Sequence, residues 1–213
     1  MPNAIIYHGA KPVYVDIDPE MFNIDVNKIE SSITPKTKAL YAQHTFGIPC
    51  NIKKIREIAN RHSLYVIEDG AQSFGAEQLG QKSCNLSDIG CTSFFPTKPL
   101  GCYGDGGAIF TSDPSLAKTL RQIARHGQEK RYYHTRLGVN SRLDTIQAAI
   151  LLAKLDILDV EIKERQNVAL RYNEGLRGNA LIKTPALIEG SSSAWAQYTI
   201  RLKNRSRLQE ELA

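Results

Sequence analysis

The 213-residue chain has few of the features that mark several common classes of protein. Its four cysteines form no C-x-x-C pair and have no His-rich segment beside them, so neither a zinc site nor a disulfide framework is predicted. No apolar run approaches the roughly 18 residues of a membrane span, and the N-terminus lacks the basic and then apolar pattern of a secretion signal. These absences predict reduced thiols, a cytoplasmic location and no membrane partner.

Two phosphate-binding motifs are also missing. The chain has no G-x-x-x-x-G-K-[ST] loop, which argues against a nucleoside triphosphatase. After Gly104 and Gly106, the third glycine of a G-x-G-x-x-G loop is replaced by Ile109, and a strand rather than a helix is predicted to follow. A dinucleotide-binding loop is therefore not indicated.

The charge balance is basic but not concentrated. The formal net charge is +5, and the basic residues are scattered and often stand beside acidic ones. Nucleic-acid-binding proteins gather such charge on one face or stripe, so no nucleic-acid partner is predicted. A small anionic partner such as a nucleotide sugar would use the same charge.

Apolar periodicity alternates between strands and helices along the first two thirds of the chain. Strands are predicted at 38–44 and 64–69, and a helix over 52–59 connects them. A strand, a crossover helix and a second strand form the parallel unit, and further strands follow at 91–95 and 108–111. The alternation predicts an α/β fold, a three-layer domain with a mainly parallel sheet.

The last third of the chain is dominated by one long helical pattern. Ser141 is predicted to cap a helix that contains no Gly or Pro before Gly175. Because ordinary helices are much shorter, we expect a break or a bridge between domains near 155–160. Residues 1–155 are predicted to form a large domain, and 156–213 a bridging helix with the start of a smaller domain.

Lys98 is predicted to lie on a constrained loop at the edge of this sheet. It stands between Pro96 and Pro99, and Pro99 both favours an extended conformation in its predecessor and lacks a backbone donor. A lysine beside buried aromatic residues is partly desolvated, which favours the neutral, nucleophilic amine. Taken alone, a surface lysine on a turn is the simpler interpretation.

Asp69 ends the apolar strand that precedes this loop. Continuously apolar strands are typical of parallel sheets covered on both faces, where ligands collect at the carboxyl ends. A lone acid at such a place is commonly a helix cap or a magnesium ligand. Together with a lysine amine at the same edge, it has the chemistry that pyridoxal phosphate needs, because the lysine binds the cofactor's aldehyde and the acid keeps the pyridine nitrogen protonated.

Several segments resemble the DegT/DnrJ/EryC1/StrS sugar aminotransferases, and they occur in the order seen in that family. The resemblance covers nearly the whole chain and is most specific within 64–152. Within the family it is strongest to enzymes that aminate a UDP-linked 3-keto-glucuronic acid for bacterial surface polysaccharide. The matching segments are Glu68–Gly75, Ser93–Gly107, Arg125–Gln128 and Gly138–Ala149.

The resemblance implies a role for each of five residues in holding pyridoxal 5'-phosphate. Lys98 would bind the cofactor covalently and then move the proton, while Asp69 would pair with the pyridinium nitrogen. Gln72 would lie beside the ring hydroxyl, and Ser93 would donate to the phosphate. Asn140 would reach the phosphate bound by a neighbouring subunit, so a homodimer is the expected assembly.

Two further residues are candidates for substrate binding. Arg142 is one, because a guanidinium fork matches the geometry of a carboxylate; a salt bridge at the start of a helix is the alternative. His44 is the other, since the resemblance places its loop near the cofactor. An ordinary loop histidine is the alternative there.

The resemblance implies transamination of a nucleotide-linked keto-sugar, with glutamate as the amino donor, in the biosynthesis of lipopolysaccharide or O-antigen. A dTDP-4-keto-hexose is the alternative substrate, since the residues decide neither the sugar nor the ring position. The family's phosphate loop and ring-stacking aromatic do not precede Pro2, and the rest of its small domain does not follow Ala213. The resemblance thus implies truncation at both ends, and a catalytically inactive fragment is a further alternative.

Overall fold

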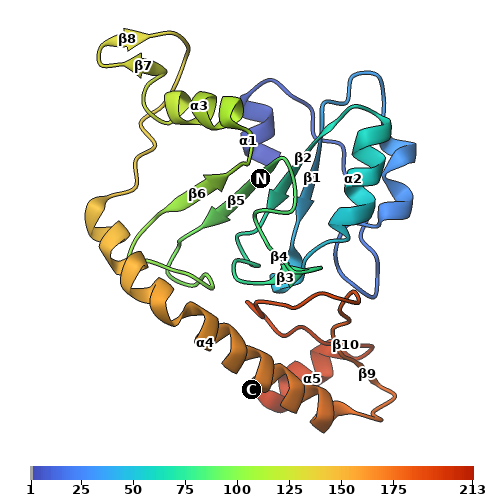
Figure 1. The fold of residues 1–213 in the computed structure, drawn as a ribbon. Coiled ribbons are helices and arrows are strands. Elements are labelled where there is room, and N and C mark those ends of the chain that lie inside the picture. The colour runs from blue at the N-terminus through green and yellow to red at the C-terminus, as the bar shows by residue number, and fades with distance from the viewer. Residues whose placement is uncertain (1) are drawn as a thin grey trace.

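The computed structural model describes residues 2–213, and a four-stranded sheet forms its centre (Figure 1). The strands are β1 (Ala39–Gln43), β2 (Tyr65–Asp69), β5 (Ile89–Ser93) and β6 (Gly107–Phe110), hydrogen-bonded in the order β1-β2-β5-β6. The first three are parallel, and β6 runs antiparallel to β5. The predicted α/β fold with a mainly parallel sheet is therefore confirmed.

Helix α2 (Ile52–Arg61) connects β1 to β2 and covers one face of the sheet, which we call the closed face. The side chain of Asn51 caps this helix by accepting from the Lys54 N–H at 3.2 Å. One apolar stripe of the helix packs on the alternate residues of the strands. The buried members of this core include Ile52, Ile55, Ile58 and Ala59 of the helix and Leu40, Ala42 and Val66 of the strands.

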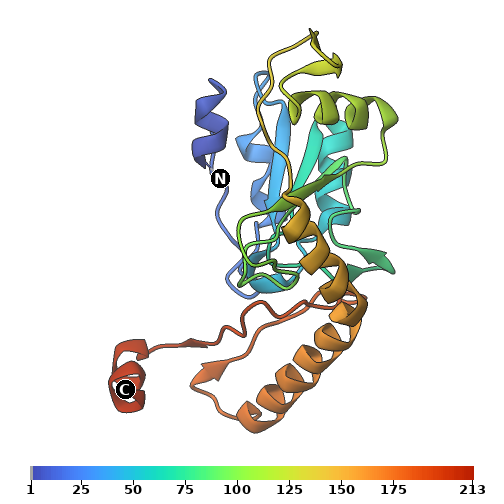
Figure 2. The ribbon, with the colours of Figure 1, turned by 90° about the vertical axis from the view of Figure 1, so that its left-hand side faces the viewer.

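The other face of the sheet, the open face, is only half covered. Side chains in a strand alternate between the two faces, and those directed away from α2 remain partly accessible to solvent. Helix α1 (Pro2–Tyr7) is well exposed and stands apart from the sheet in Figure 2. The open-face residues that matter below are Tyr41, Asp69, Cys91 and Ser93.

Shorter elements surround the sheet. Three 3-10 turns precede α2, and two small hairpins and helix α3 lie between α2 and α4 in the chain. The hairpin that follows α3 projects from the body of the molecule in Figure 1. These elements are η1 (Val26–Lys28), η2 (Glu30–Ser32), η3 (Thr45–Gly47), β3 (Glu77–Gln78), β4 (Gln81–Lys82), α3 (Pro114–Ile123), β7 (Gln128–Lys130) and β8 (Tyr133–His134).

Helix α4 (Thr145–Leu176) runs without a break for 32 residues and bridges the sheet and the C-terminal segment (Figure 1). The expected break near 155–160 is absent because the helix contains no Gly or Pro before Gly175, which lies in its last turn. Asp144 is the N-cap and accepts from the Ile146 N–H at 2.9 Å. The predicted cap at Ser141 is wrong, since its backbone N–H donates instead to the Ala124 carbonyl at 3.0 Å.

The C-terminal segment contains β9 (Ile182–Lys183), β10 (Arg201–Leu202) and α5 (Arg205–Leu212). Its part around Trp195 and Tyr198 packs on the far half of α4, whereas α5 stands apart from α4 in Figure 2. The anchor of this segment is the buried Trp195, whose indole N–H donates to the Gln166 side-chain oxygen at 2.7 Å. Despite the length of α4, no helix within residues 2–213 combines the length and apolar character needed to cross a membrane.

Candidate active site

The carboxyl ends of β1, β2 and β5 meet at one edge of the sheet, where a parallel sheet commonly binds ligands. The register places Gln43, Asp69 and Cys91 side by side in these three strands. Ser93 follows two residues after Cys91 and so lies on the same face as Asp69. Two of the predicted cofactor ligands therefore share both an edge and a face.

The Asp69 carboxylate is held by two donors. Its Oδ1 accepts from the Ala71 N–H at 3.0 Å, and its Oδ2 accepts from the hydroxyl of Tyr41. The turn that follows is tightly packed, because a Cβ on Gly70 would lie 2.3 Å from the Cys84 Sγ. The carboxylate is thus fixed at the end of β2 and remains half-buried on the open face.

Lys98 lies on a bend beyond β5, as its two flanking prolines predict. Its backbone N–H donates to the Phe95 carbonyl at 2.9 Å, and the residue is half-buried. The loop is anchored on both sides of the lysine by Phe94 and Leu100, which belong to one buried cluster with Leu151 of α4. The loop is therefore fixed in place by its apolar residues.

Two polar side chains of α4 also hold this loop. The Nζ of Lys154 donates to the Gly101 carbonyl at 2.6 Å, and the Gln147 Oε1 accepts from the Tyr103 N–H at 2.8 Å. These residues stand seven apart, two turns along one helix face. Sequence reasoning missed both, although this spacing on a predicted helix was the available signal.

Gln72 and Ser93 each keep a donor for a ligand. The Gln72 Oε1 accepts from the Phe46 N–H at 2.6 Å, and no partner for its NH₂ group is found within residues 2–213. The Ser93 Oγ accepts from the Phe95 N–H at 3.2 Å, which leaves the hydroxyl proton to donate. Both side chains can therefore donate to the oxygens of an anionic or phenolic ligand.

His44 is fully buried, which corrects the prediction that it binds substrate. Its Nδ1 accepts from the Cys50 N–H at 3.0 Å, so the ring proton is on Nε2, which donates to the Glu68 carboxylate at 2.8 Å. The other Glu68 oxygen accepts from the Leu86 N–H at 2.8 Å. Both ring nitrogens are thus used inside the protein, beneath the closed face.

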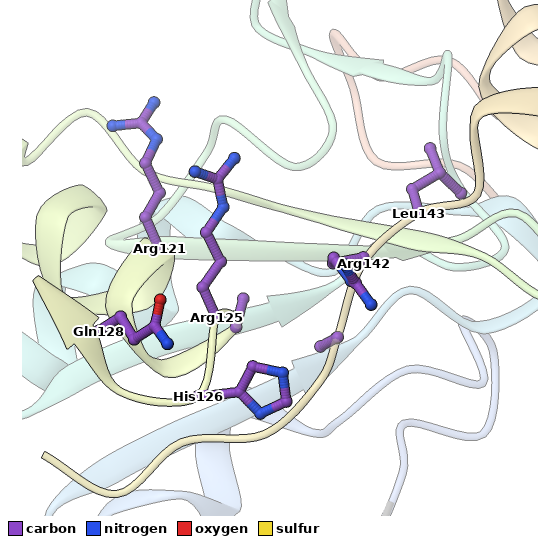
Figure 3. Close-up of a pocket in the computed structure, with 8 residues that line it drawn as sticks. Arg121, Arg125, His126, Gln128, Arg142 and Leu143 are labelled. Carbon is purple, nitrogen blue, oxygen red and sulfur yellow. The ribbon is translucent and has the colours of Figure 1, made fainter. Parts of the chain in front are cut away.

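Asn140 and Arg142 lie on the exposed segment between β8 and α4. The Arg142 Nε donates to the Asn140 Oδ1 at 2.8 Å. Arg142 borders a hollow of about 620 Å³ together with Arg121 and Arg125 (Figure 3). The ion pairs formed within residues 2–213 do not include Arg142, so the alternative of a salt bridge at the helix start is not found.

The edge of the sheet carries a negative field. Burial raises the pKa of the Cys91 thiol, and the charges of Asp69 and Glu68 raise it further. Burial also raises the pKa of Tyr41 above its usual range, and the hydrogen bond to Asp69 and the charge of that carboxylate add to the effect. Such a field stabilises a cation placed beside Asp69, as a protonated pyridine would be.

Known proteins resemble this chain over nearly its whole length. UDP-2-acetamido-2-deoxy-3-oxo-D-glucuronate aminotransferase of Pseudomonas aeruginosa is 55% identical over 204 residues, which is 96% of this chain and 56% of that protein. A dTDP-3-amino-3,4,6-trideoxy-alpha-D-glucose transaminase of Streptomyces venezuelae is 38% identical over 98% of this chain and 55% of its own length. The chain thus spans just over half the length of these curated relatives.

The fold is shared with solved structures. The crystal structure of ntda from Bacillus subtilis with bound cofactor pmp superposes with a TM-score of 0.88 and 36% sequence identity, over 97% of this chain and 48% of that one. The family model described as the DegT/DnrJ/EryC1/StrS aminotransferase family matches residues 2–213. The sequence segments, the site and the fold agree, and the chain belongs to the DegT/DnrJ/EryC1/StrS aminotransferase family.

Proposed function

We propose that the protein is a pyridoxal-phosphate-dependent aminotransferase that acts on a nucleotide-linked keto-sugar. The observation that carries the proposal is the placement of Asp69 and the Lys98 loop at the carboxyl ends of neighbouring strands in a member of this family. A related protein has been solved with the aminated form of the cofactor bound, which supports the same cofactor here.

The residues at the edge fit the cofactor. Asp69 would face the ring nitrogen and keep it protonated, since a fixed carboxylate stabilises the neighbouring positive charge. When bound, pyridoxal phosphate supplies an electron sink for the substrate's α-carbon. The Lys98 amine would hold the cofactor and move the proton at that carbon, while Gln72 and Ser93 would donate to the ring hydroxyl and the phosphate.

We propose a UDP-linked 3-keto-glucuronic acid as the sugar substrate and glutamate as the amino donor. The relative at 55% identity bears the name of an aminotransferase for such a sugar, which supports this choice. Arg142 would bind the sugar carboxylate, because it borders a hollow that Arg121 and Arg125 also border and that no acidic residue lines within residues 2–213. A dTDP-linked keto-hexose is the second candidate, since a relative at 38% identity bears such a name.

We further propose a cytoplasmic homodimer in which Asn140 reaches the cofactor phosphate of the neighbouring subunit. The position of Asn140 on an exposed segment supports this contact. In this arrangement residues 1–155 belong to the cofactor-binding large domain, and 156–213 form the bridge and part of a small domain. Sedimentation of the purified protein with and without cofactor would measure the assembly.

The substrate proposal is tested by supplying both sugars. The protein is incubated with glutamate and either the UDP-linked 3-keto-glucuronic acid or a dTDP-4-keto-hexose, and the products are identified by mass and NMR. Amination of the UDP sugar is expected, and amination of only the dTDP sugar would overturn that assignment. Turnover of neither, with cofactor bound, would instead favour the alternative of a catalytically inactive fragment.

A further inference from the structure

We infer that Tyr41 is a positioning residue of this site, whose hydroxyl holds the Asp69 carboxylate in the orientation that the cofactor's ring nitrogen requires. The inference rests on the proposed function. It concerns a residue of β1 that no pattern in the sequence singles out, and it begins from the hydrogen bond between the Tyr41 hydroxyl and the Asp69 Oδ2.

The strand register brings the two side chains together. Tyr41 of β1 pairs with Ile67 of β2, and Asp69 follows two residues later on the same face. Tyr41 is therefore the diagonal neighbour of Asp69 on the open face. A tyrosine side chain is long enough to reach its diagonal neighbour, and its hydroxyl donates a hydrogen bond to the carboxylate.

The two oxygens of Asp69 are held from different directions. The Ala71 N–H binds Oδ1 from the turn after β2, and the Tyr41 hydroxyl binds Oδ2 from β1. Two donors on separate elements restrict rotation of the carboxylate about its Cβ–Cγ bond. Each carboxylate oxygen has two lone pairs, so a further bond from a protonated ring nitrogen remains possible.

Tyr41 acts only as a donor in this pair. Burial, and then the bond to Asp69, raise the pKa of Tyr41 above its usual range, so the phenol stays protonated throughout the working range of pH. Deleting the hydroxyl would leave the carboxylate with one donor and a wider range of orientations.

The simpler interpretation is that Tyr41 only fills space on the open face. Tyr41→Phe distinguishes this interpretation from the positioning role, because it removes only the hydroxyl. Tyr65→Phe is the matched control. Tyr65 lies on β2 with 60% of its surface exposed, and no hydrogen bond of its hydroxyl is found within residues 2–213. Both variants keep the aromatic ring, so both should fold, which circular dichroism and thermal unfolding would check.

A first measurement needs no cofactor. In NMR spectra of the cofactor-free protein, a hydroxyl proton held in a hydrogen bond to a half-buried carboxylate exchanges more slowly than a free one and resonates downfield. We expect this signal in the wild type and in Tyr65→Phe, its loss in Tyr41→Phe, and a shift in Asp69→Asn. Its absence from the wild type, or its survival in Tyr41→Phe, would show that the pair does not exist in solution.

A second measurement tests whether the hydrogen bond between Tyr41 and Asp69 strengthens the interaction of Asp69 with the cofactor's ring nitrogen. Dissociation constants are measured for pyridoxal phosphate and for its 1-deaza analogue, in which a C–H replaces that nitrogen. The wild type should prefer pyridoxal phosphate, and Tyr41→Phe should reduce the preference by about tenfold, a typical effect of one hydrogen bond to a charged group. Tyr65→Phe should keep the full preference.

The outcomes separate this inference from the proposed function. If the wild type prefers pyridoxal phosphate and Tyr41→Phe keeps that preference, or if Tyr41→Phe weakens both compounds equally, the positioning role is wrong and the proposed function stands. If the wild type binds neither compound or binds both alike, the proposed role of Asp69 fails, and the positioning role fails with it, even where the hydroxyl signal persists.

Discussion

The two faces of the central sheet are built from the same three parallel strands, yet their polar side chains differ in burial and in hydrogen bonding. On the closed face, Glu68 is fully buried and both its oxygens are bound by the protein, by His44 and by the Leu86 N–H. On the open face, Asp69, the next residue in the chain, is only half-buried and keeps the capacity to accept another donor. Two adjacent acids thus have opposite environments.

The difference shows how one strand serves stability and chemistry at once. A buried polar group is tolerated only when all its hydrogen bonds are made, so the closed face satisfies each group internally. A ligand-binding group must keep a hydrogen-bonding site free. When the group is partly exposed, water can occupy that site, so the free-energy cost of leaving it unpaired is small. We therefore expect substitutions on the closed face to change stability and substitutions on the open face to change ligand binding.

The largest effect is expected from removing the amine. Lys98→Ala should reduce transamination by roughly three orders of magnitude or more, because the proposed function assigns covalent binding of the cofactor to this amine. The fold should persist, since the loop is anchored by Phe94 and Leu100 rather than by the lysine. Turnover is measured with glutamate and keto-sugar, and Lys118→Ala, an exposed lysine of α3, is the control. Retained turnover would remove Lys98 from the mechanism.

The next effect falls on the closed face. Glu68→Ala leaves the His44 Nε2–H and the Leu86 N–H buried without partners, and each such loss costs about 1–3 kcal/mol. The free energy of unfolding in urea should fall by roughly 2–6 kcal/mol. Glu57→Ala, at an exposed position of α2, should change it by less than about 0.5 kcal/mol. Equal effects of the two variants would contradict the distinction between the faces.

Asp69→Asn sharpens the comparison, because it changes the acid of the open face. The neutral amide cannot keep the ring nitrogen protonated, so affinity for pyridoxal phosphate should fall by about 10- to 100-fold. Unfolding in urea should change far less than in Glu68→Ala, since Asp69 is half-buried. Binding is followed by the visible absorbance of the cofactor. The account would be contradicted by a large loss of stability with affinity unchanged.

The smallest effect is expected when the reactivities of two thiols, one on each side of the sheet, are compared. Burial raises the pKa of Cys50 to about 12, and it also raises the pKa of the half-buried Cys91. A small alkylating reagent at pH 8 should label Cys91 first, because reaction needs both a thiolate and access. Below the pKa of Cys91, its labelling should speed up about tenfold per pH unit as the thiolate fraction rises. Mass mapping measures the order, and earlier labelling of Cys50 would reverse it.

The parts of the site that local sequence predicts are those that depend on neighbouring residues. Asp69 ends an apolar strand, and the prolines beside Lys98 exclude a helix, so both positions could be inferred before the structure. Family resemblance added Gln72 and Ser93, which lie at the same edge of the sheet with donors available. For Asp69 and Lys98 the pattern of neighbouring residues is sufficient, whereas Gln72 and Ser93 could be named only by resemblance.

The parts that were missed depend on partners far apart in the chain. His44 is buried by Glu68, 24 residues later, and Tyr41 meets Asp69 only through the register of two strands. Ser141 and Asp144 are both good helix caps, so local pattern does not choose between them. The contacts of this segment with the end of α3 favour the later start, because Asn140 forms a bridge with Arg125 and the Ser141 N–H is bonded to the Ala124 carbonyl.

The central claim is that the loop beyond β5 presents Lys98 to a cofactor at the edge of the sheet, and chemical trapping tests it most directly. Pyridoxal phosphate is added to the protein, the complex is reduced with borohydride, and the peptides are mapped by mass to locate the phosphopyridoxyl group. The account predicts one label per chain on Lys98, with little on other lysines and with much less label in Asp69→Asn. Label distributed over the exposed lysines, with Lys98 not preferred, would contradict it.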